Sequence, residues 1–232
     1  MVRCNVVSVN FEEEAGSGRY HHGDLPAALI SSATALVEEE GLEAFTLREV
    51  ARRVGVSHTA PYRHFADKQV LLAAVAEKGF AELGAATRAA FEAEPDLADG
   101  FLSVGQSYVG FAVKRPVLFR LMFDPSLDEK HPALTDAKEA AFGVLLGAVA
   151  AAQQSGVLRK GDLVDVAITA WAAVHGLAQL AIDRALEPRL EGVRALDEWA
   201  DTVTRLVLQG GKVTGVETDR GTIATDKVLI AG

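Results

Sequence analysis

Apolar residues recur with the period of amphipathic helices over most of the chain. Between Asp24 and Gly41, leucines and alanines return at helical spacing, and the two flanking residues are a suitable N-cap and a suitable helix end. Beyond Pro95 the amphipathic segments become longer and are separated by prolines and glycines. These segments are Asp96 to Lys114, Pro116 to Phe123, Pro132 to Gly156, Asp162 to Leu186 and Val193 to Gln209. The pattern predicts an all-α fold.

A short helix with clear boundary signals is predicted in the run FTLREVARRVG. Thr46 and Glu49 have the spacing of a capping box, and Phe45 can pack on Val50 as a hydrophobic staple. Gly55 can take the left-handed conformation that ends a helix. The apolar positions of this run are expected to face the protein interior.

A third helix is expected to begin two residues after this glycine. Ser57 is suitable as its N-cap, Pro61 lies early in it, where a missing N–H costs least, and Phe65 would anchor it in the core. Asp67 then caps a longer helix that runs to about Pro95. Two short helices joined by a tight turn with a glycine predict a helix-turn-helix.

The pattern divides the chain into four parts. Residues 1–23 are predicted to be a flexible arm, 24–68 a helix-turn-helix domain, 69–209 a larger helical domain, and 210–232 a β-hairpin-like tail around a DRG turn. The last two helical segments are broadly apolar, and pairing with their copies in a second subunit would bury the excess apolar surface. We therefore expect a homodimer.

The composition indicates a globular protein with a large core, since 49% of the 232 residues are hydrophobic. Cys4 is the only cysteine, so no internal disulfide can form, and no leader sequence is recognisable. The longest apolar stretches, which begin at Ala140 and Ala167, are shorter than the ~18 uncharged residues of a spanning helix. We expect a cytoplasmic protein that does not enter the membrane.

The net charge of -9 conceals a local excess of positive charge. Between Ala44 and Lys68, five basic residues stand against two acidic ones. A small cationic face on an acidic protein suits docking onto a polyanion. Within this face, Arg52 and Arg53 are expected to be solvated rather than to read bases.

The order of side chains after Gly55 suits a recognition helix in the DNA major groove. Short hydrogen-bonding side chains come first, where the helix dipole favours an anion, and side chains that reach phosphates follow. In the arm, Arg19, His21 and His22 are candidates for a phosphate or minor-groove contact. The alternative is a solvated charged face, but spacing, capping and charge together favour DNA. The residues expected to contact DNA are Thr46, Arg48, Ser57, His58, Thr59, Tyr62, Arg63, His64 and Lys68.

At these residues the chain resembles a known family. The run TLREVARRVGVSHTAPYRHFADKQVLLAAVAEKGF resembles the DNA-binding region of the TetR (tetracycline-repressor-like) family of bacterial transcriptional regulators, and RYHHGDLPAALISSATALVEEEG resembles the helix before it. Further on, WAAVHGL is similar to the Trp-His-Gly signature of one ligand-binding-domain branch of that family. The residues that carry the first resemblance are Thr46, Ala51, Gly55, Val56, Ser57, Tyr62, Phe65, Lys68 and Leu71.

The resemblance spans about Arg19 to Gln209 and implies a mechanism. It implies an all-helical homodimer with a four-helix interface from the last two helices, and a small-molecule effector that releases a repressor from a palindromic operator. Two recognition helices bind successive major grooves only when they lie roughly 34 Å apart. A ligand that prefers a wider spacing would weaken DNA binding.

Large side chains on the later helices are candidates to line an effector cavity. Such residues at helical spacing are also typical of ordinary core, and His175 has two interpretations: a hydrogen-bonded structural histidine, or a contact for a polar effector group. The candidates are Tyr108, Phe111, Phe119, Met122, Phe142, Trp171 and His175.

The sequence does not indicate an enzyme. It contains no nucleophile elbow, no phosphate loop and no glycine fingerprint after a strand. His21, His22 and Asp24 are close neighbours on or beside the predicted arm and do not make a preorganised metal cage. We expect no catalytic residue, no cofactor and no metal.

The tail VTGVETDRGTIATDKVLIAG is similar to a hairpin piece of a flavin-dependent amine or amino-acid oxidoreductase. No dinucleotide-binding glycine motif accompanies it, so flavin cannot be inferred. Two alternatives to a regulator follow from the sequence: a fragment or fusion of a flavin-dependent oxidoreductase, and a helical ligand-binding module without DNA binding.

Overall fold

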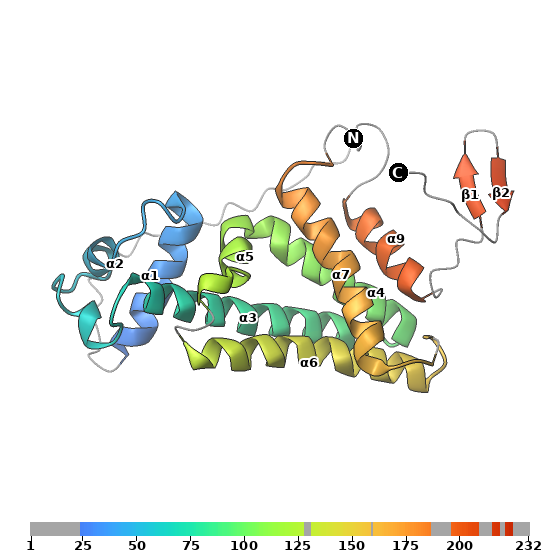
Figure 1. Ribbon diagram of the computed structural model, residues 1–232, viewed down its shortest axis with the longest axis horizontal. Helices are drawn as coiled ribbons and strands as arrows, with labels where there is room; N and C mark the ends of the chain where they lie inside the picture. The colour runs from blue at the N-terminus through green and yellow to red at the C-terminus, as the bar shows by residue number, and fades with distance from the viewer. Residues whose placement is uncertain are drawn as a thin grey trace, which may run out of the picture.

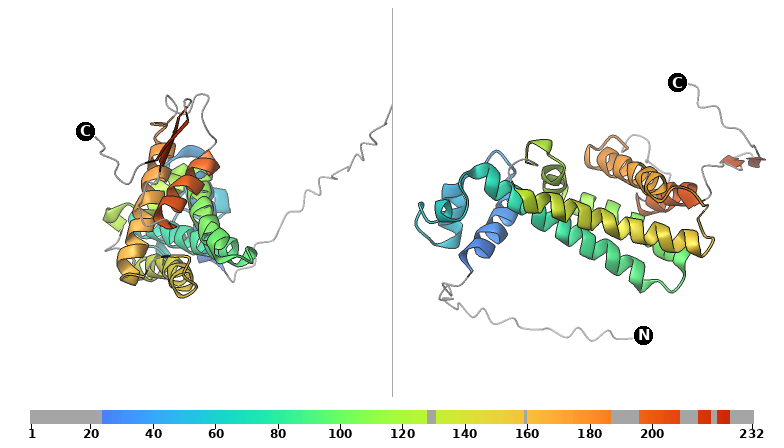
Figure 2. Two further views of the ribbon diagram at one scale, coloured as in Figure 1. Left: turned by 90° about the vertical axis from the view of Figure 1, so that its right-hand side faces the viewer. Right: turned by 60° about the horizontal axis from the view of Figure 1, so that its bottom comes forward.

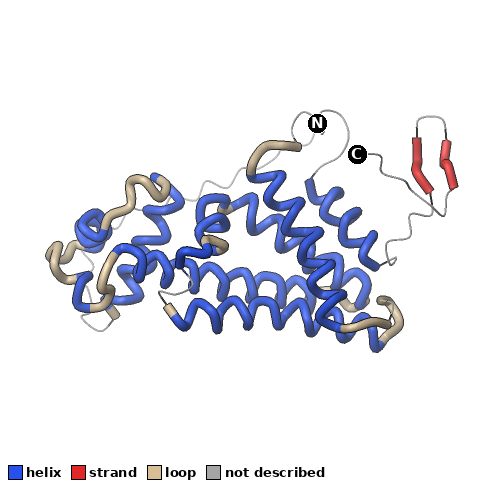
Figure 3. Tube along the Cα trace, in the orientation of Figure 1, coloured by secondary structure: helices blue, strands red, loops and turns tan. Residues whose placement is uncertain are grey.

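The computed structural model describes residues 24–127, 131–158, 160–186, 196–208, 215–218 and 221–224. Over these residues the fold is helical apart from two four-residue strands (Figures 1 and 3). The head contains α1 (Leu25–Glu40), α2 (Leu47–Val54) and the 3₁₀ turn η1 (Pro61–Arg63). The body contains α4 (Leu97–Lys114), α5 (Pro116–Met122), η2 (Pro125–Leu127), α6 (Pro132–Gln154), α7 (Leu163–Ile182) and α9 (Leu196–Leu208). The helix α3 (Lys68–Ala93) connects the two.

Local capping rules account for the boundaries of the head helices. The Asp24 carboxylate accepts a hydrogen bond from the Ala27 N–H at 3.3 Å, and the Thr46 hydroxyl accepts one from the Glu49 N–H at 3.1 Å. Gly55 ends α2 in the left-handed conformation, with φ 78°. These predicted boundaries are confirmed.

The capping of α3 is confirmed too, since the Asp67 carboxylate accepts from the Val70 N–H at 3.0 Å. The 26 residues of α3 are long enough to reach from the head into the body, about 39 Å at the α-helical rise. α6 packs alongside α3 in the body, as the right-hand view of Figure 2 shows. α3 is therefore common to both parts of the fold.

One cluster of buried apolar side chains continues from the head into the body. It includes Leu36 of α1, Leu71 of α3, Leu118 of α5 and Leu177 of α7. A second cluster, which includes Phe101, lies between α4, α6 and α7 farther along the body. The first cluster therefore connects the packing of the head with that of the body.

α4 and α9 approach each other closely at Gly105. A methyl group at this position would overlap the hydroxyl of the buried Thr204, which donates to the Ala200 carbonyl at 2.8 Å. We expect Gly105→Ala to lower the free energy of unfolding by about 1–3 kcal/mol, because α9 must shift or Thr204 must give up its hydrogen bond.

Urea unfolding followed by circular dichroism measures this loss. Gly110→Ala, on the same helix, is the matched control, since a methyl group there meets nothing within 4 Å. Helix propensity alone should stabilise that variant by up to about 1 kcal/mol. Equal effects of the two substitutions would refute the close approach of α4 and α9.

α7 is long and apolar enough to cross a membrane by length and composition alone, contrary to the expectation from its apolar stretch. It nevertheless packs against α4, α6 and α9, and 33% of its most apolar window is buried within the protein. A core helix of a soluble protein passes the same test, so α7 is weak evidence for a membrane span. Three of its apolar side chains, Val164, Ile168 and Leu180, are exposed.

The strands β1 (Gly215–Thr218) and β2 (Gly221–Ala224) pair antiparallel, with Val216 opposite Ile223. The other residues of the predicted tail, and the predicted arm of residues 1–23, lie outside the described residues. Arg19, His21 and His22 belong to that arm, so their expected DNA contacts stay predictions.

Candidate nucleic-acid interface and ligand cavity

The segment after Gly55 is not the α-helix that the sequence predicts. Ser57 makes no helix cap; its carbonyl accepts from the Ala60 N–H at 2.9 Å, and η1 spans only Pro61–Arg63. An α-helix would need a bond from the N–H of residue 61 to the Ser57 carbonyl, and proline has no N–H. A series of tight turns replaces the helix for this reason.

These turns nevertheless bring the predicted polar residues to one exposed segment. Tyr62 is 57% exposed, while Pro61 and Phe65 on either side of the polar residues are buried. The Ser57 and Thr59 hydroxyls lie 3.2 Å apart and hydrogen-bond to each other. The other exposed members of the segment are His58, Arg63 and His64. The segment therefore presents phenol, hydroxyl, imidazole and guanidinium groups together at the surface.

Lys68 differs from these residues because its side chain is partly buried. Its Nζ donates to the Leu42 carbonyl at 3.3 Å and lies 5.6 Å from the centroid of the Phe45 ring. Lys68 therefore holds the loop between α1 and α2 in addition to any contact with a phosphate.

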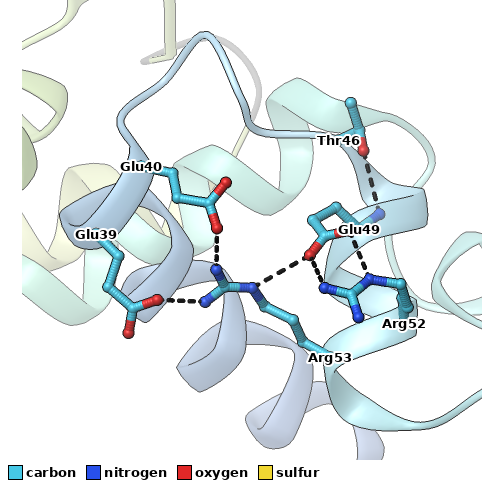
Figure 4. A network of polar contacts seen from close by, with 6 residues as sticks. All are labelled: Glu39, Glu40, Thr46, Glu49, Arg52 and Arg53. Atoms are coloured by element: carbon cyan, nitrogen blue, oxygen red, sulfur yellow. Dashed lines mark hydrogen bonds and ion pairs between the residues drawn. The ribbon is translucent and has the colours of Figure 1, made fainter.

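Arg52 and Arg53 form ion pairs within the head (Figure 4). The Arg52 side chain is also exposed, in line with the expectation that it is solvated, whereas the Arg53 side chain is partly buried. Arg53 of α2 binds Glu39 at 2.6 Å and Glu40, both at the end of α1, and also approaches Glu49 at 3.4 Å. Arg52 binds both carboxylate oxygens of Glu49, at 2.8 and 2.6 Å. The hydrogen bond from Arg52 lowers the pKa of Glu49 to about 2.

This network changes two conclusions drawn from the sequence. The Glu49 carboxylate binds arginines, so only the Thr46 half of the predicted capping box is formed. The local positive charge is also smaller than the count between Ala44 and Lys68 indicates, because Glu39 and Glu40 lie outside that window. Arg48 makes no ion pair with the described residues and is exposed, as is Arg63. Both guanidinium groups are therefore accessible to solvent.

Arg115, at the start of α5, links the head to the body. Its guanidinium binds Glu38 of α1 and Glu82 of α3 and lies 5.5 Å from the centroid of the Phe111 ring of α4. Four elements therefore meet at one cation. α1 ends in several glutamates, which the helix dipole disfavours there, so the positive charge of Arg115 also offsets that cost.

The body contains a cavity of about 450 Å³, within the range of about 300–1,000 Å³ that holds small ligands. Helices α3, α4, α6, α7 and α9 contribute its wall, which is almost entirely apolar. The lining residues used below are Phe80, Thr87, Tyr108, Lys138, Glu139, Phe142, Ile168, Trp171 and Thr204.

Three of the seven predicted effector residues line this cavity: Tyr108, Phe142 and Trp171. Phe119 and Met122 are completely buried in the core cluster instead. Phe111 packs under Arg115, and His175 stands behind Tyr108. The small and aliphatic lining residues, such as Thr87 and Thr204, were missed because nothing in helical spacing distinguishes a cavity wall from core.

Tyr108 connects the cavity to His175. Its hydroxyl accepts from Trp171 Nε1 at 3.0 Å and lies 2.8 Å from His175 Nδ1. Burial raises the pKa of Tyr108 above its usual value and lowers the pKa of His175, so both shifts favour the neutral forms. The Tyr108 oxygen accepts a hydrogen bond from Trp171 Nε1. The Tyr108 O–H can therefore donate its own proton to His175 Nδ1 when that nitrogen carries no hydrogen. This favours the structural interpretation of His175.

In the described part of the chain, no group of three or more histidine, cysteine, aspartate or glutamate side chains could hold a metal ion. Two of the three residues first considered for a metal, His21 and His22, lie outside that part.

Known proteins resemble this chain in both the head and the body. Residues 29–75 match the family model described as "Bacterial regulatory proteins, tetR family", and residues 101–206 match the "Tetracyclin repressor-like, C-terminal domain". Both matches end before the tail, and the oxidoreductase alternative is not favoured. The tetracycline repressor protein class A from transposon 1721 of Escherichia coli is 42% identical over 57 residues, which are 25% of this chain and 26% of that repressor. The match thus spans about a quarter of that relative's length.

Solved structures of other proteins match the fold of this chain over most of its length. A protein of unknown function from Rhodococcus sp. RHA1 is 33% identical with a TM-score of 0.70, over 83% of this chain and 98% of that one. The TetR family transcriptional regulator PfmR from Thermus thermophilus is 20% identical with a TM-score of 0.59, over 78% and 97% of the two chains, and shows a shared fold. With two models of one family together matching more than half of its residues, the chain belongs to the TetR family of bacterial regulatory proteins.

Proposed function

We propose that the protein is a dimeric transcriptional repressor that leaves a palindromic DNA operator when a small molecule occupies the cavity. The observation that carries this proposal is the exposed segment from Ser57 to His64, whose polar side chains surround an exposed tyrosine on the head. Hydroxyl, imidazole and phenol groups suit base edges, and the guanidinium groups of Arg48 and Arg63 suit phosphates. A soluble, cytoplasmic protein follows from this function.

The proposed dimer interface uses the exposed apolar side chains of α7. Val164, Ile168, Ala172, Gly176 and Leu180 follow one another at intervals of four residues, which forms a ridge along a helix. Val164, Ile168 and Leu180 are each close to half exposed, although they are apolar. A ridge of this kind is self-complementary about a two-fold axis, and α9, which packs against α7, carries the exposed Leu206.

The proposed effect of the ligand follows from the continuity between cavity and head. Phe80 of α3 and Tyr108 of α4 line the cavity, and both belong to the core cluster that extends into α1. Arg115 adds a polar link between the same parts. A ligand that fits the body better in one arrangement shifts the population of head positions, and reciprocity requires that DNA weakens ligand binding equally.

We assign residues 24–68 to DNA binding and 69–209 to ligand binding and dimerisation. The matches at residues 29–75 and 101–206 support the order of the two parts but have other bounds. The paired strands β1 and β2 follow the last matched residue and are an addition to the family architecture.

A salt titration tests the DNA contacts. The logarithm of the affinity for duplex DNA should fall with the logarithm of salt concentration at a slope of about -0.9 per neutralised phosphate. Arg48→Ala and Arg63→Ala should each weaken binding to all duplexes and reduce the slope by about 2 per dimer, one phosphate per subunit. Fluorescence anisotropy with a labelled duplex measures both quantities.

Arg52→Ala is the matched control, since it lies on the same helix as Arg48 but is already paired with Glu49. Its slope should change less than that of Arg48→Ala. Binding that does not depend on salt in the unmodified protein would reject the phosphate contacts. Lys68→Ala is a poorer probe, because it also removes the bond to the Leu42 carbonyl.

His58→Ala and Thr59→Ala should act differently, since their exposed side chains are placed for base edges. We expect each to change the preferred operator sequence, at a cost of about 1–3 kcal/mol for the original site. Selection of binding sites from a random duplex library reads out the preference. A uniform loss over all sequences would instead assign these residues to the DNA backbone.

A further inference from the structure

The hydroxyl groups in the cavity wall have their protons committed to the protein. Thr87 Oγ1 donates to the carbonyls of Leu83 at 2.9 Å and Gly84 at 3.2 Å. Thr204 Oγ1 donates to the Ala200 carbonyl at 2.8 Å. Each threonine oxygen therefore offers only lone pairs to a molecule in the cavity.

The same holds for the aromatic polar groups. Trp171 Nε1 is committed to the Tyr108 hydroxyl, and that hydroxyl has an acceptor for its own proton in His175 Nδ1. Within the described ranges, the only buried side-chain nitrogen or oxygen without a partner is Trp199 Nε1, and Trp199 does not line the cavity. The buried wall thus presents acceptors and no uncommitted side-chain donor.

The cavity wall contains two charged residues, which are consecutive in the sequence and opposite in charge. Lys138 and Glu139 both lie on α6; Glu139 is exposed, and the Lys138 ammonium lies 5.7 Å from the centroid of the Phe80 ring. The two charges sum to zero but stand at adjacent helix positions, which do not face each other, and a charged ligand would lose hydration against the otherwise apolar wall. Neither a carboxylate nor an ammonium is favoured by this arrangement.

We infer that the cavity takes an uncharged, mainly apolar molecule whose polar group is a hydrogen-bond donor, such as an alcohol or a phenol. The donor would bind the free lone pairs of Thr87 or Thr204, and the remaining surface of the ligand would be apolar. This inference depends on the proposed role of the cavity as the effector site, and it names the ligand class that the site selects.

A matched set of probes on one skeleton tests the class. Isothermal titration calorimetry of the dimeric full-length protein near neutral pH compares biphenyl, para-phenylphenol, para-methoxybiphenyl and biphenyl para-carboxylate. The phenol should bind about 3- to 10-fold more tightly than the methoxy compound, which lacks the donor. The carboxylate should bind at least about 10-fold more weakly than the phenol.

Two substitutions locate the acceptor. Thr87→Val and Thr204→Val keep the shape of the side chain and remove the hydroxyl oxygen, so one of them should abolish the advantage of the phenol while biphenyl binds as before. Thr169→Val is the matched control, because its hydroxyl also bonds a carbonyl four residues back but does not line the cavity. An unchanged advantage in both wall variants would overturn the assignment.

Other outcomes are equally decisive. Tighter binding of the carboxylate, equal binding of the phenol and the methoxy compound, or binding of none of the four probes up to their solubility would each overturn the inference. DNA release is measured separately by anisotropy with a labelled operator. If the phenol binds best but does not release DNA, the ligand class stands and the proposed function fails. If the protein binds its operator but prefers the carboxylate, the function stands and the ligand class fails.

Discussion

Replacing Leu180 by arginine is expected to split the dimer and to weaken binding to a two-half-site operator by roughly 100- to 10,000-fold, since the second half-site contact is no longer intramolecular. Leu180 lies on the apolar ridge of α7 and is 48% exposed in the single subunit. In a symmetric interface the guanidinium would be buried against apolar side chains or against its own copy. Sedimentation velocity measures the dimer, and anisotropy measures the affinity.

Thr135→Arg is the matched control for this prediction. Thr135 is an exposed residue of α6, outside the ridge, and the substitution makes the same change in charge. It should leave both the dimer and the operator affinity unchanged. A Leu180→Arg protein that remains a dimer with full affinity would show that α7 does not form the interface.

Phe119→Ala is expected to lower the free energy of unfolding by about 3–5 kcal/mol, the range for removing a buried phenylalanine. The ring is completely buried, meets Tyr108 edge-on with centroids 5.6 Å apart, and lies 5.0 Å from Phe123 and 5.5 Å from His175. Its loss leaves a hole behind Tyr108, which also forms part of the cavity wall. Chemical denaturation followed by circular dichroism gives the value.

Phe111→Ala provides the comparison, because Phe111 is only partly buried beneath Arg115. We expect a clearly smaller loss of stability there. If Phe119→Ala left stability intact and changed only the affinity for a ligand, Phe119 would be an effector contact, the role for which the sequence makes it a candidate.

The helix boundaries of the head could be predicted because their causes are local. Asp24, Thr46 and Asp67 each cap a helix through an N–H three residues away, and Gly55 ends α2 through its own backbone freedom. Such interactions involve neighbours in the chain, so residue type and spacing are sufficient to find them.

In the exposed segment from Ser57 to His64, a local sequence rule predicts the wrong secondary structure. Proline suits the first turn of a helix, but Pro61 is four residues beyond Ser57, where an α-helix anchored at that serine needs an N–H. No local rule determines the exposure of Tyr62 either, because it depends on Pro61 and Phe65 packing into the head.

The sequence by itself determined the helical fold, the caps at Asp24, Thr46 and Asp67, and the order of polar side chains that points to DNA, because these depend on periodicity and on contacts a few residues apart. Only the tertiary structure decided that Arg53 binds glutamates of another helix, that Phe119 is core, and that Thr87 and Thr204 face a cavity. Each of these features depends on contacts between residues that are far apart in the chain. Arg53 forms an ion pair with Glu40, and Thr87 and Thr204 line the same cavity. No pattern along a single helix specifies which distant side chains will meet it.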